Sequence, residues 1–164
     1  MTDIDFYVSA VTRNRVLDTP LGTPPEAWEA ALGGDFLDDV HKKDMRRDYA
    51  LVELAFIRSG GHWQSVTASI QVHRLARGIQ GIVPAPLEQA YGPFAPRTRF
   101  DAFHDALREQ GGNLEEVKDP SLGGFRYFRE TTTRADIYVV DEPPSEEFEA
   151  GTLWSVILSQ TDSP

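Results

Sequence analysis

Hydrophobic and polar residues alternate along two stretches in the first half of the chain. Apolar side chains occupy every second position from Tyr49 to Ile57, and the alternation returns from Trp63 to Arg74. A period of two is typical of a strand with one buried and one wet face. The residues between the stretches, Ser-Gly-Gly at 59–61, form a turn signal. The pattern therefore predicts an antiparallel hairpin.

Helical spacing of apolar residues occurs once in each half. Residues 23–33 predict a helix that opens with a capping box, Thr23 and Glu26, and ends at a Gly-Gly pair. Residues 99–110 predict a second helix, capped by Thr98, with an aromatic face and another Gly-Gly stop.

The remaining elements follow from shorter patterns. Strands are expected at 6–11, 125–130, 136–140 and 152–159, a short helix at 87–91, and a solvated acidic-then-basic connector at 35–48. A proline- and glycine-rich segment, 78–97, joins two pseudo-halves, 1–82 and 83–164, within a single domain, 1–164. We therefore expect an α+β fold with an antiparallel sheet and helices on one face, built as two tandem helix–strand halves.

The charge is large and uneven. The 164 residues carry a net charge of −10, divided into 11 acidic and 9 basic side chains up to residue 82 and 15 acidic and 7 basic after it. Such a charge disfavours binding to nucleic acid or an anionic membrane and favours a basic protein partner. The sequence has no cysteine, no apolar stretch long enough to span a bilayer and no signal-peptide pattern at Met1. We expect a cytoplasmic protein, and the oligomeric state stays open.

Catalytic motifs are missing from the sequence. His41, His62, His73 and His104 do not pair at metal-ligand spacing, and the aspartates at 35–39 lack the order of a calcium loop. Nucleophile elbows, phosphate-binding loops and dinucleotide fingerprints are also missing. The expectation is a protein that is not an enzyme and that has no metal, no cofactor and no catalytic residue.

One charge run stands out as a candidate binding segment. Between two expected strands, residues 141–149 combine five acids, two prolines and one aromatic residue. The run is either an ordinary exposed loop or an acidic recognition loop with an aromatic anchor. Trp63, beside the glycine turn, is a second candidate anchor, whereas Trp28 and Trp154 are expected in the core. The candidate partner-binding residues are Asp141, Glu142, Glu146, Glu147, Phe148, Glu149 and Trp63.

Part of the chain is similar to known families. The similarity lies in residues 21–28, 32–33, 46–56, Trp63 and 71–75. These segments resemble small actinobacterial immunity proteins that are encoded beside polymorphic toxins. The helix-to-hairpin pattern is also similar to β-lactamase inhibitory protein-like domains, in which two tandem helix–strand units form a sheet that grips an enzyme.

The resemblance implies a non-enzymatic inhibitor. Such a protein would neutralise a cognate bacterial toxin, for example a basic nuclease, by covering its active site. The alternative is a small-molecule-binding or enzymatic α+β domain whose pocket is assembled from distant residues. Its candidate lining consists of His73, Arg74, Tyr49 and Glu53, which would have to share one face.

Overall fold

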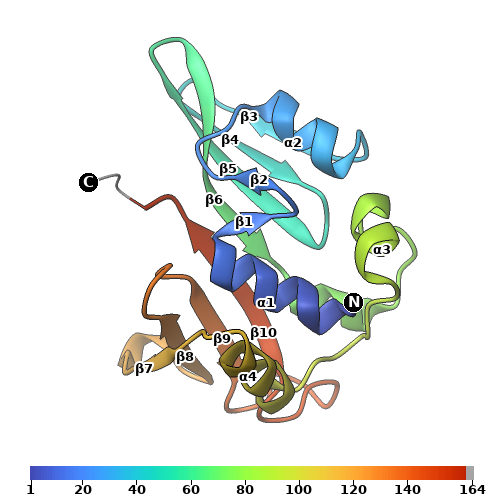
Figure 1. Cartoon of the computed structure of the whole chain (residues 1–164), viewed down its shortest axis with the longest axis vertical. Helices are drawn as coiled ribbons and strands as arrows, with labels where there is room; N and C mark the ends of the chain where they lie inside the picture. Colours follow the sequence, from blue (N-terminus) through green and yellow to red (C-terminus); the bar gives the residue numbers. More distant parts are fainter. Residues whose placement is uncertain (162–164) are drawn as a thin grey trace.

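An eight-stranded antiparallel sheet organises the chain in a computed structural model that describes residues 1–161 (Figure 1). Its strand order is β3-β4-β5-β6-β10-β9-β8-β7. The strands are β3 (Leu37–Val40), β4 (Asp44–Asp48), β5 (Val52–Ser59), β6 (His62–Ile70), β7 (Leu114–Val117), β8 (Phe125–Glu130), β9 (Asp136–Val140) and β10 (Leu153–Ser159). Four α-helices accompany it: α1 (Asp3–Arg13), α2 (Pro25–Leu32), α3 (Ala85–Tyr91) and α4 (Phe100–Glu109).

Two tandem helix–strand halves make up this fold. In each half one helix precedes a four-stranded meander, α2 before β3 to β6 and α4 before β7 to β10. The last strands of the two meanders pair with each other, with Val156 opposite Ile70. The expected α+β class and the two-half arrangement are therefore confirmed.

The helices lie on one face of the sheet, in front of it in Figure 1. Between the layers is the main core, where Trp28 of α2, Leu54 of β5 and Phe103 of α4 are almost fully buried. The indole Nε1 of Trp28 donates a hydrogen bond of 3.0 Å to Ser65 Oγ on β6. This contact fixes α2 over the first meander and satisfies a donor that burial would otherwise leave unpaired.

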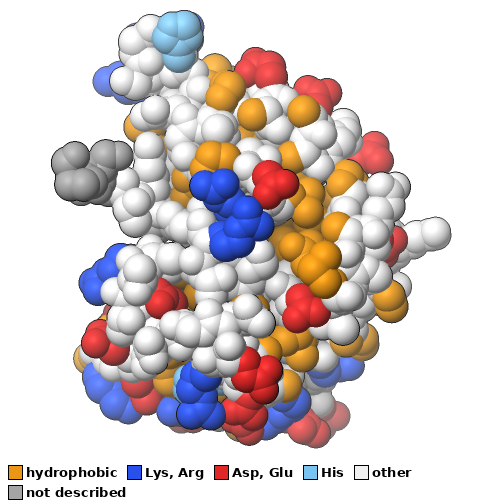
Figure 2. Space-filling view, in the orientation of Figure 1, with side chains coloured by type: hydrophobic (Ala, Val, Ile, Leu, Met, Phe, Trp, Pro, Cys, Tyr) orange, Lys and Arg blue, Asp and Glu red, His pale blue; other side chains and the backbone are white. Residues whose placement is uncertain are grey.

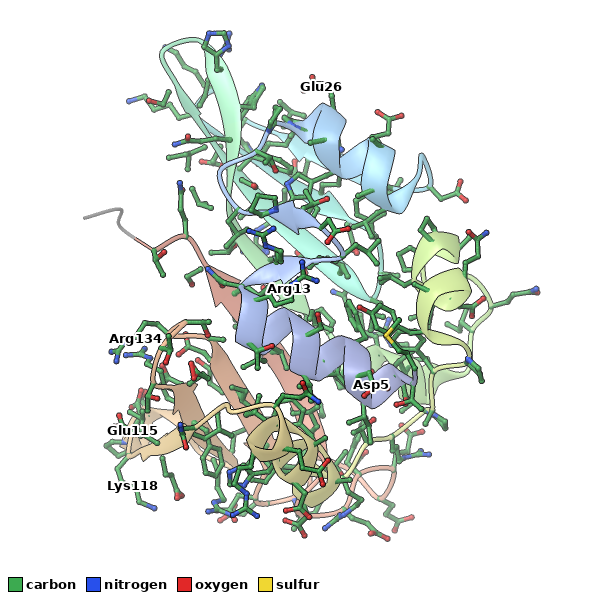
Figure 3. All side chains as sticks on the ribbon, viewed as in Figure 1. Asp5, Arg13, Glu26, Glu115, Lys118 and Arg134 are labelled. Atoms are coloured by element: carbon green, nitrogen blue, oxygen red, sulfur yellow. The ribbon has the colours of Figure 1, made fainter. Side chains whose placement is uncertain are left out.

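The N-terminal segment is a helix, so the strand expected at 6–11 is wrong. Thr2 caps α1 in a capping box with Asp5, and apolar side chains recur three and four positions apart along the helix. The negative charge of Asp5 near the start of α1 and the positive charge of Arg13 in its last turn interact favourably with the helix dipole (Figure 3).

The prediction of a solvated connector at 35–48 is also wrong, because this segment forms β3 and β4. The inward-facing residues of β4 are Met45 and Arg47. Because Arg47 is charged, the sequence of β4 does not show the alternation of apolar and polar residues that would predict a strand. The Arg47 guanidinium binds both carboxylate oxygens of Asp38 at 2.9 and 3.1 Å, and it stacks 3.7 Å from the Phe36 ring centroid. A charged residue therefore takes a core position with its charge paired.

Several element ends differ from the expectation. The second hairpin strand ends at Ile70, and Val72–Arg77 form a 3₁₀ helix, η1. Helix α2 begins at Pro25 with Pro24 at its N-cap, and α4 begins with Arg99 there, so neither Thr23 nor Thr98 caps a helix. A two-stranded hairpin, β1 (Arg15–Val16) with β2 (Thr19–Pro20), and a 3₁₀ turn, η2 (Pro120–Leu122), complete the fold.

Candidate protein-binding face

The side of the sheet opposite the helices carries the candidate site. Because side chains alternate across a strand, the positions between the core residues point to this second side. In β8 these are Phe125, Tyr127 and Arg129, which flank the core residue Phe128. We call this side the open face, since the four α-helices of the described chain all lie on the other side.

Four rings meet on the open face around Trp154. His73 stacks on the indole with ring centroids 4.2 Å apart and planes 4° from parallel. Phe125 lies 5.1 Å from the indole, and Phe148 approaches it edge-on at 4.9 Å. All four side chains are half-buried, and all lie outside the main core. We call this group the Trp154 cluster; it joins η1, β8, β10 and the loop between β9 and β10.

A β-bulge explains why Trp154 lies on this side. The register between β10 and β9 shifts between Leu153 and Ser155, so one extra residue interrupts the alternation there. Leu153 faces the core with no exposed area, and the bulge places the following indole on the open face. The expectation that Trp154 belongs to the core is therefore wrong.

A stacked tyrosine pair continues the aromatic surface. The rings of Tyr127 and Tyr138 lie 5.0 Å apart at 17°. Asp136 accepts hydrogen bonds from the Tyr127 hydroxyl and, at 2.9 Å, from Arg129 Nε. Burial, with Asp136 as the next largest cause, raises the pKa of Tyr127 to about 12, so the Tyr127 hydroxyl keeps its proton and remains a donor near neutral pH.

The acidic segment 141–149 lies beside the Trp154 cluster, in the loop between β9 and β10. All five of its carboxylates are exposed, whereas Phe148 turns inward onto Trp154. Arg97 Nε donates a bond of 2.5 Å to the carbonyl of Glu147, and Arg99 lies 3.8 Å from the Glu149 carboxylate. The loop is thus tied to the segment before α4 and presents its remaining acids to solvent.

Trp63 lies on the other side of the sheet. It pairs with Arg58 near the β5–β6 turn, on the helix-facing side, and packs against the edge of the main core. Phe148 of segment 141–149 therefore belongs to the aromatic cluster of the open face, and Trp63 does not.

The four candidate residues of the alternative ligand pocket also lie on different sides of the sheet. Glu53 and Arg74 approach to 3.5 Å on the open face, and Gln71 Nε2 donates to the same carboxylate at 3.2 Å. His73 belongs to the Trp154 cluster. Tyr49 is buried on the helix side, where its hydroxyl donates to the Gly33 carbonyl at 3.1 Å. These four side chains do not share one face.

A separate groove of about 720 Å³ opens on the helix side. It lies between the end of α2, the loop at 78–84 and α3, and its lining includes Tyr49, Ile82 and Phe94. Apolar side chains gather in this region of the helix side (Figure 2). Within residues 1–161, no group of three or more histidine, aspartate or glutamate side chains is placed to hold a metal ion.

Sequence reasoning missed most of the aromatic cluster. His73 and Phe125, like Tyr138 of the neighbouring tyrosine pair, could be identified only as members of separate elements, and the sequence predicts Trp154 in the core. The available signal was the alternation in β8, Phe-Arg-Tyr-Phe-Arg, which places aromatic residues on both faces of one strand. An antiparallel strand with one wet face carries mostly polar residues there, so this excess of aromatics was informative.

The chain matches no known protein-family model, no curated protein and no solved structure at a significant level. Its described helices are all too short or too polar to cross a membrane.

Proposed function

We propose that this protein is a non-enzymatic inhibitor that binds another protein through its open face. The observation that carries the proposal is the Trp154 cluster, four half-buried rings on a sheet face that no α-helix of the described chain covers. Aromatic residues are enriched at protein interfaces and dominate their binding energy.

Charge supports a basic partner. The five acids of segment 141–149 lie next to the rings, and the outward positions of the open face add more carboxylates than cations. These open-face carboxylates are Asp39, Asp44, Asp48, Glu53, Glu115 and Asp136, against the cations Arg46, Arg74 and Arg129. An acidic rim around an apolar centre speeds encounter with a basic surface.

Within this class, the resemblance to immunity proteins favours a cognate bacterial toxin as the partner, for example a basic nuclease in the cytoplasm. Such an inhibitor works by covering the partner's active site, which requires no reactive group of its own. The two-half sheet offers a rigid platform for that purpose, because β6 and β10 pair directly across the middle.

A pull-down from the native host tests the proposal. The wild-type protein should retain one basic partner at low salt and lose it at moderate salt, as screening weakens the encounter. Trp154→Ala bait should lose the partner, whereas Trp63→Ala bait should keep it. Absence of a stoichiometric protein partner at either salt concentration contradicts the proposal.

A second candidate function, small-molecule binding, is supported by the groove beside Tyr49 and Phe94. Its volume lies in the range of ligand sites, roughly 300–1,000 Å³. A thermal shift with metabolites that is lost in a groove variant such as Ile82→Asp, and kept in Trp154→Ala, would favour this function.

A further inference from the structure

The groove between the end of α2, the loop at 78–84 and α3 has an apolar wall. Leu75, Ile79, Ile82 and Phe94 all contribute to its lining. Leu75 and Ile82 are buried, whereas 62% of the Ile79 surface is in contact with solvent. Ligand pockets typically combine such apolar walls with a few charged or polar groups, so the charges of the lining indicate which ligand the groove suits.

Both charged side chains of the lining are acidic. Asp35 follows α2, Glu88 lies in the first turn of α3, and both are exposed. Neither carboxylate takes part in an ion pair among residues 1–161. Arg47, which lies close to Tyr49, is outside the lining, and its guanidinium already binds Asp38 at 2.9 and 3.1 Å. Within the described chain, the groove therefore presents two carboxylates and no cationic side chain.

The end of α2 adds a partial negative charge. Its last helical residue, Leu32, and its C-cap, Gly33, both line the groove. The C-terminal end of an α-helix attracts cations, and basic side chains commonly neutralise it. The Tyr49 hydroxyl donates to the Gly33 carbonyl but brings no charge. Because the described last turn of α2 contains no basic residue, this end of the helix dipole remains available to a cation in the groove.

The start of α3 offers little to an anion. This helix begins with Ala85, and Pro84 and Pro86 on either side of it have no N–H to donate. The N–H groups of residues 87 and 88 both donate to the Pro84 carbonyl, at 2.9 and 3.3 Å. A carboxylate or phosphate in the groove would therefore find few backbone donors and two repelling carboxylates.

We propose that the groove binds a small organic cation, an ammonium or guanidinium group carried on an apolar body. The apolar body lies against Ile82 and Phe94, and the cationic group approaches the carboxylates at its rim. This inference rests on the second candidate function, small-molecule binding, and names the chemical class of its ligand. It does not depend on the inhibitor proposal, because the groove and the Trp154 cluster lie on opposite sides of the sheet.

The probes are three compounds that share an indole ring and differ in charge: tryptamine, the neutral tryptophol and the anionic indole-3-acetate. Each is titrated into ¹⁵N-labelled protein at about pH 7, where the amine of tryptamine is protonated. We expect saturable shifts of the amide signals at 32–35 and 78–88, without shifts around Trp154. Tryptamine should bind about fivefold more tightly than tryptophol at low salt, indole-3-acetate should bind more weakly than either, and the differences should shrink at high salt.

Neutral variants of the two carboxylates test their role. Asp35→Asn combined with Glu88→Gln keeps the size of both exposed side chains, so the melting temperature should be unchanged. In this double variant tryptamine should bind no more tightly than tryptophol, and the affinity for tryptophol should stay within about twofold. The control is Glu109→Gln, which changes an exposed acid at the end of α4 and should keep the preference for tryptamine.

The proposal is overturned if tryptamine causes no saturable shifts in the groove, if the three probes bind equally, or if the double variant keeps the preference for tryptamine. Shifts around Trp154 in place of the groove overturn it as well, because the cation would then bind the acidic open face. Equal binding of the three probes removes only the cationic class and leaves small-molecule binding in the groove intact, whereas absence of binding by all three counts against both. Neither result bears on the inhibitor proposal.

Discussion

Trp154 and His73 lie face to face, with ring centroids 4.2 Å apart and ring planes 4° from parallel. The His73 ring nitrogen Nδ1 also lies 3.3 Å from the Trp154 carbonyl oxygen. The two residues belong to different halves of the chain, so this stack ties η1 to β10 across the middle of the sheet. It is the centre of the proposed binding face.

Replacing Trp154 with alanine should weaken partner binding strongly. Interface aromatics of this kind contribute about 2 kcal/mol or more when truncated, which corresponds to about 30-fold in Kd. Calorimetry or surface plasmon resonance with the purified partner measures the change. The matched control is Trp63→Ala, on the other side of the sheet, which should leave Kd within about twofold; equal losses in the two variants would contradict the proposed face.

Charge reversal in the acidic loop should act on the association rate. Glu146→Lys with Glu147→Lys should slow association several-fold at low salt and flatten its salt dependence, because exposed charges act through long-range steering. The dissociation rate should change little. Reversal of Asp101 and Asp105 on α4 is the control; stopped-flow traces that respond equally to both double variants would remove the loop from the binding face.

Stability should fall as the pH drops below neutrality, in part through His73. Burial is the largest cause that lowers the pKa of this imidazole; Arg74 and Arg77 also lower it, and the bond to the Trp154 carbonyl opposes them. The unfolded chain therefore takes up the proton first. The stability contributed by neutral His73 is present above about pH 6.5 and is lost as the pH falls through the lowered value.

Urea unfolding at about pH 7.5 and about pH 5.5 measures this effect. His73→Phe keeps an aromatic ring on Trp154 and should unfold with a smaller difference between the two conditions. His104 also has a lowered pKa, chiefly because of burial, so His104→Gln serves as the parallel control. A His73→Phe protein with the full wild-type difference would contradict the assignment.

The buried Trp28–Ser65 contact should contribute to global stability. Trp28→Phe keeps an aromatic ring but removes one of the two N–H donors to Ser65 Oγ, the other being Gly22 N at 3.1 Å, and leaves part of the indole volume empty. The free energy of unfolding should drop by about 2–3 kcal/mol. Ser65→Ala tests the same bond from the other side, and additive losses in the double variant would show that the two residues are not coupled.

The β5–β6 hairpin and helix α4 could be predicted because the sequence patterns that indicate them are local. Alternation alone identified β5 and most of β6, and glycine pairs marked the end of α4. The order of helix and strands in each half then indicated the tandem architecture, because a meander needs only short connections.

The errors arise where tertiary contacts override a local pattern. Arg47 occupies an inward position of β4 because Asp38 neutralises it and Phe36 covers it, and neither contact is visible along the sequence. Helix α1 is a different case, since Thr2 and Asp5 form a capping box that sequence reasoning could have recognised.

The candidate site was predicted only in part. The acidic loop with Phe148 was identified from composition, and the structure places that ring on Trp154. The rest of the cluster depends on the bulge in β10 and on the pairing of β6 with β10, which brings His73 to the indole. The bulge and the strand pairing both arise only when the sheet assembles, so the sequences of the separate strands do not predict them.

The most direct test of the inhibitor account is hydroxyl-radical footprinting of the protein with and without the partner recovered from the host. The account predicts that Trp154, Phe148, Phe125 and Tyr138 become protected in the complex, whereas Trp63 is labelled as before. Protection of Trp63 and of helices α2 and α3, with Trp154 and Phe148 still labelled, would contradict it.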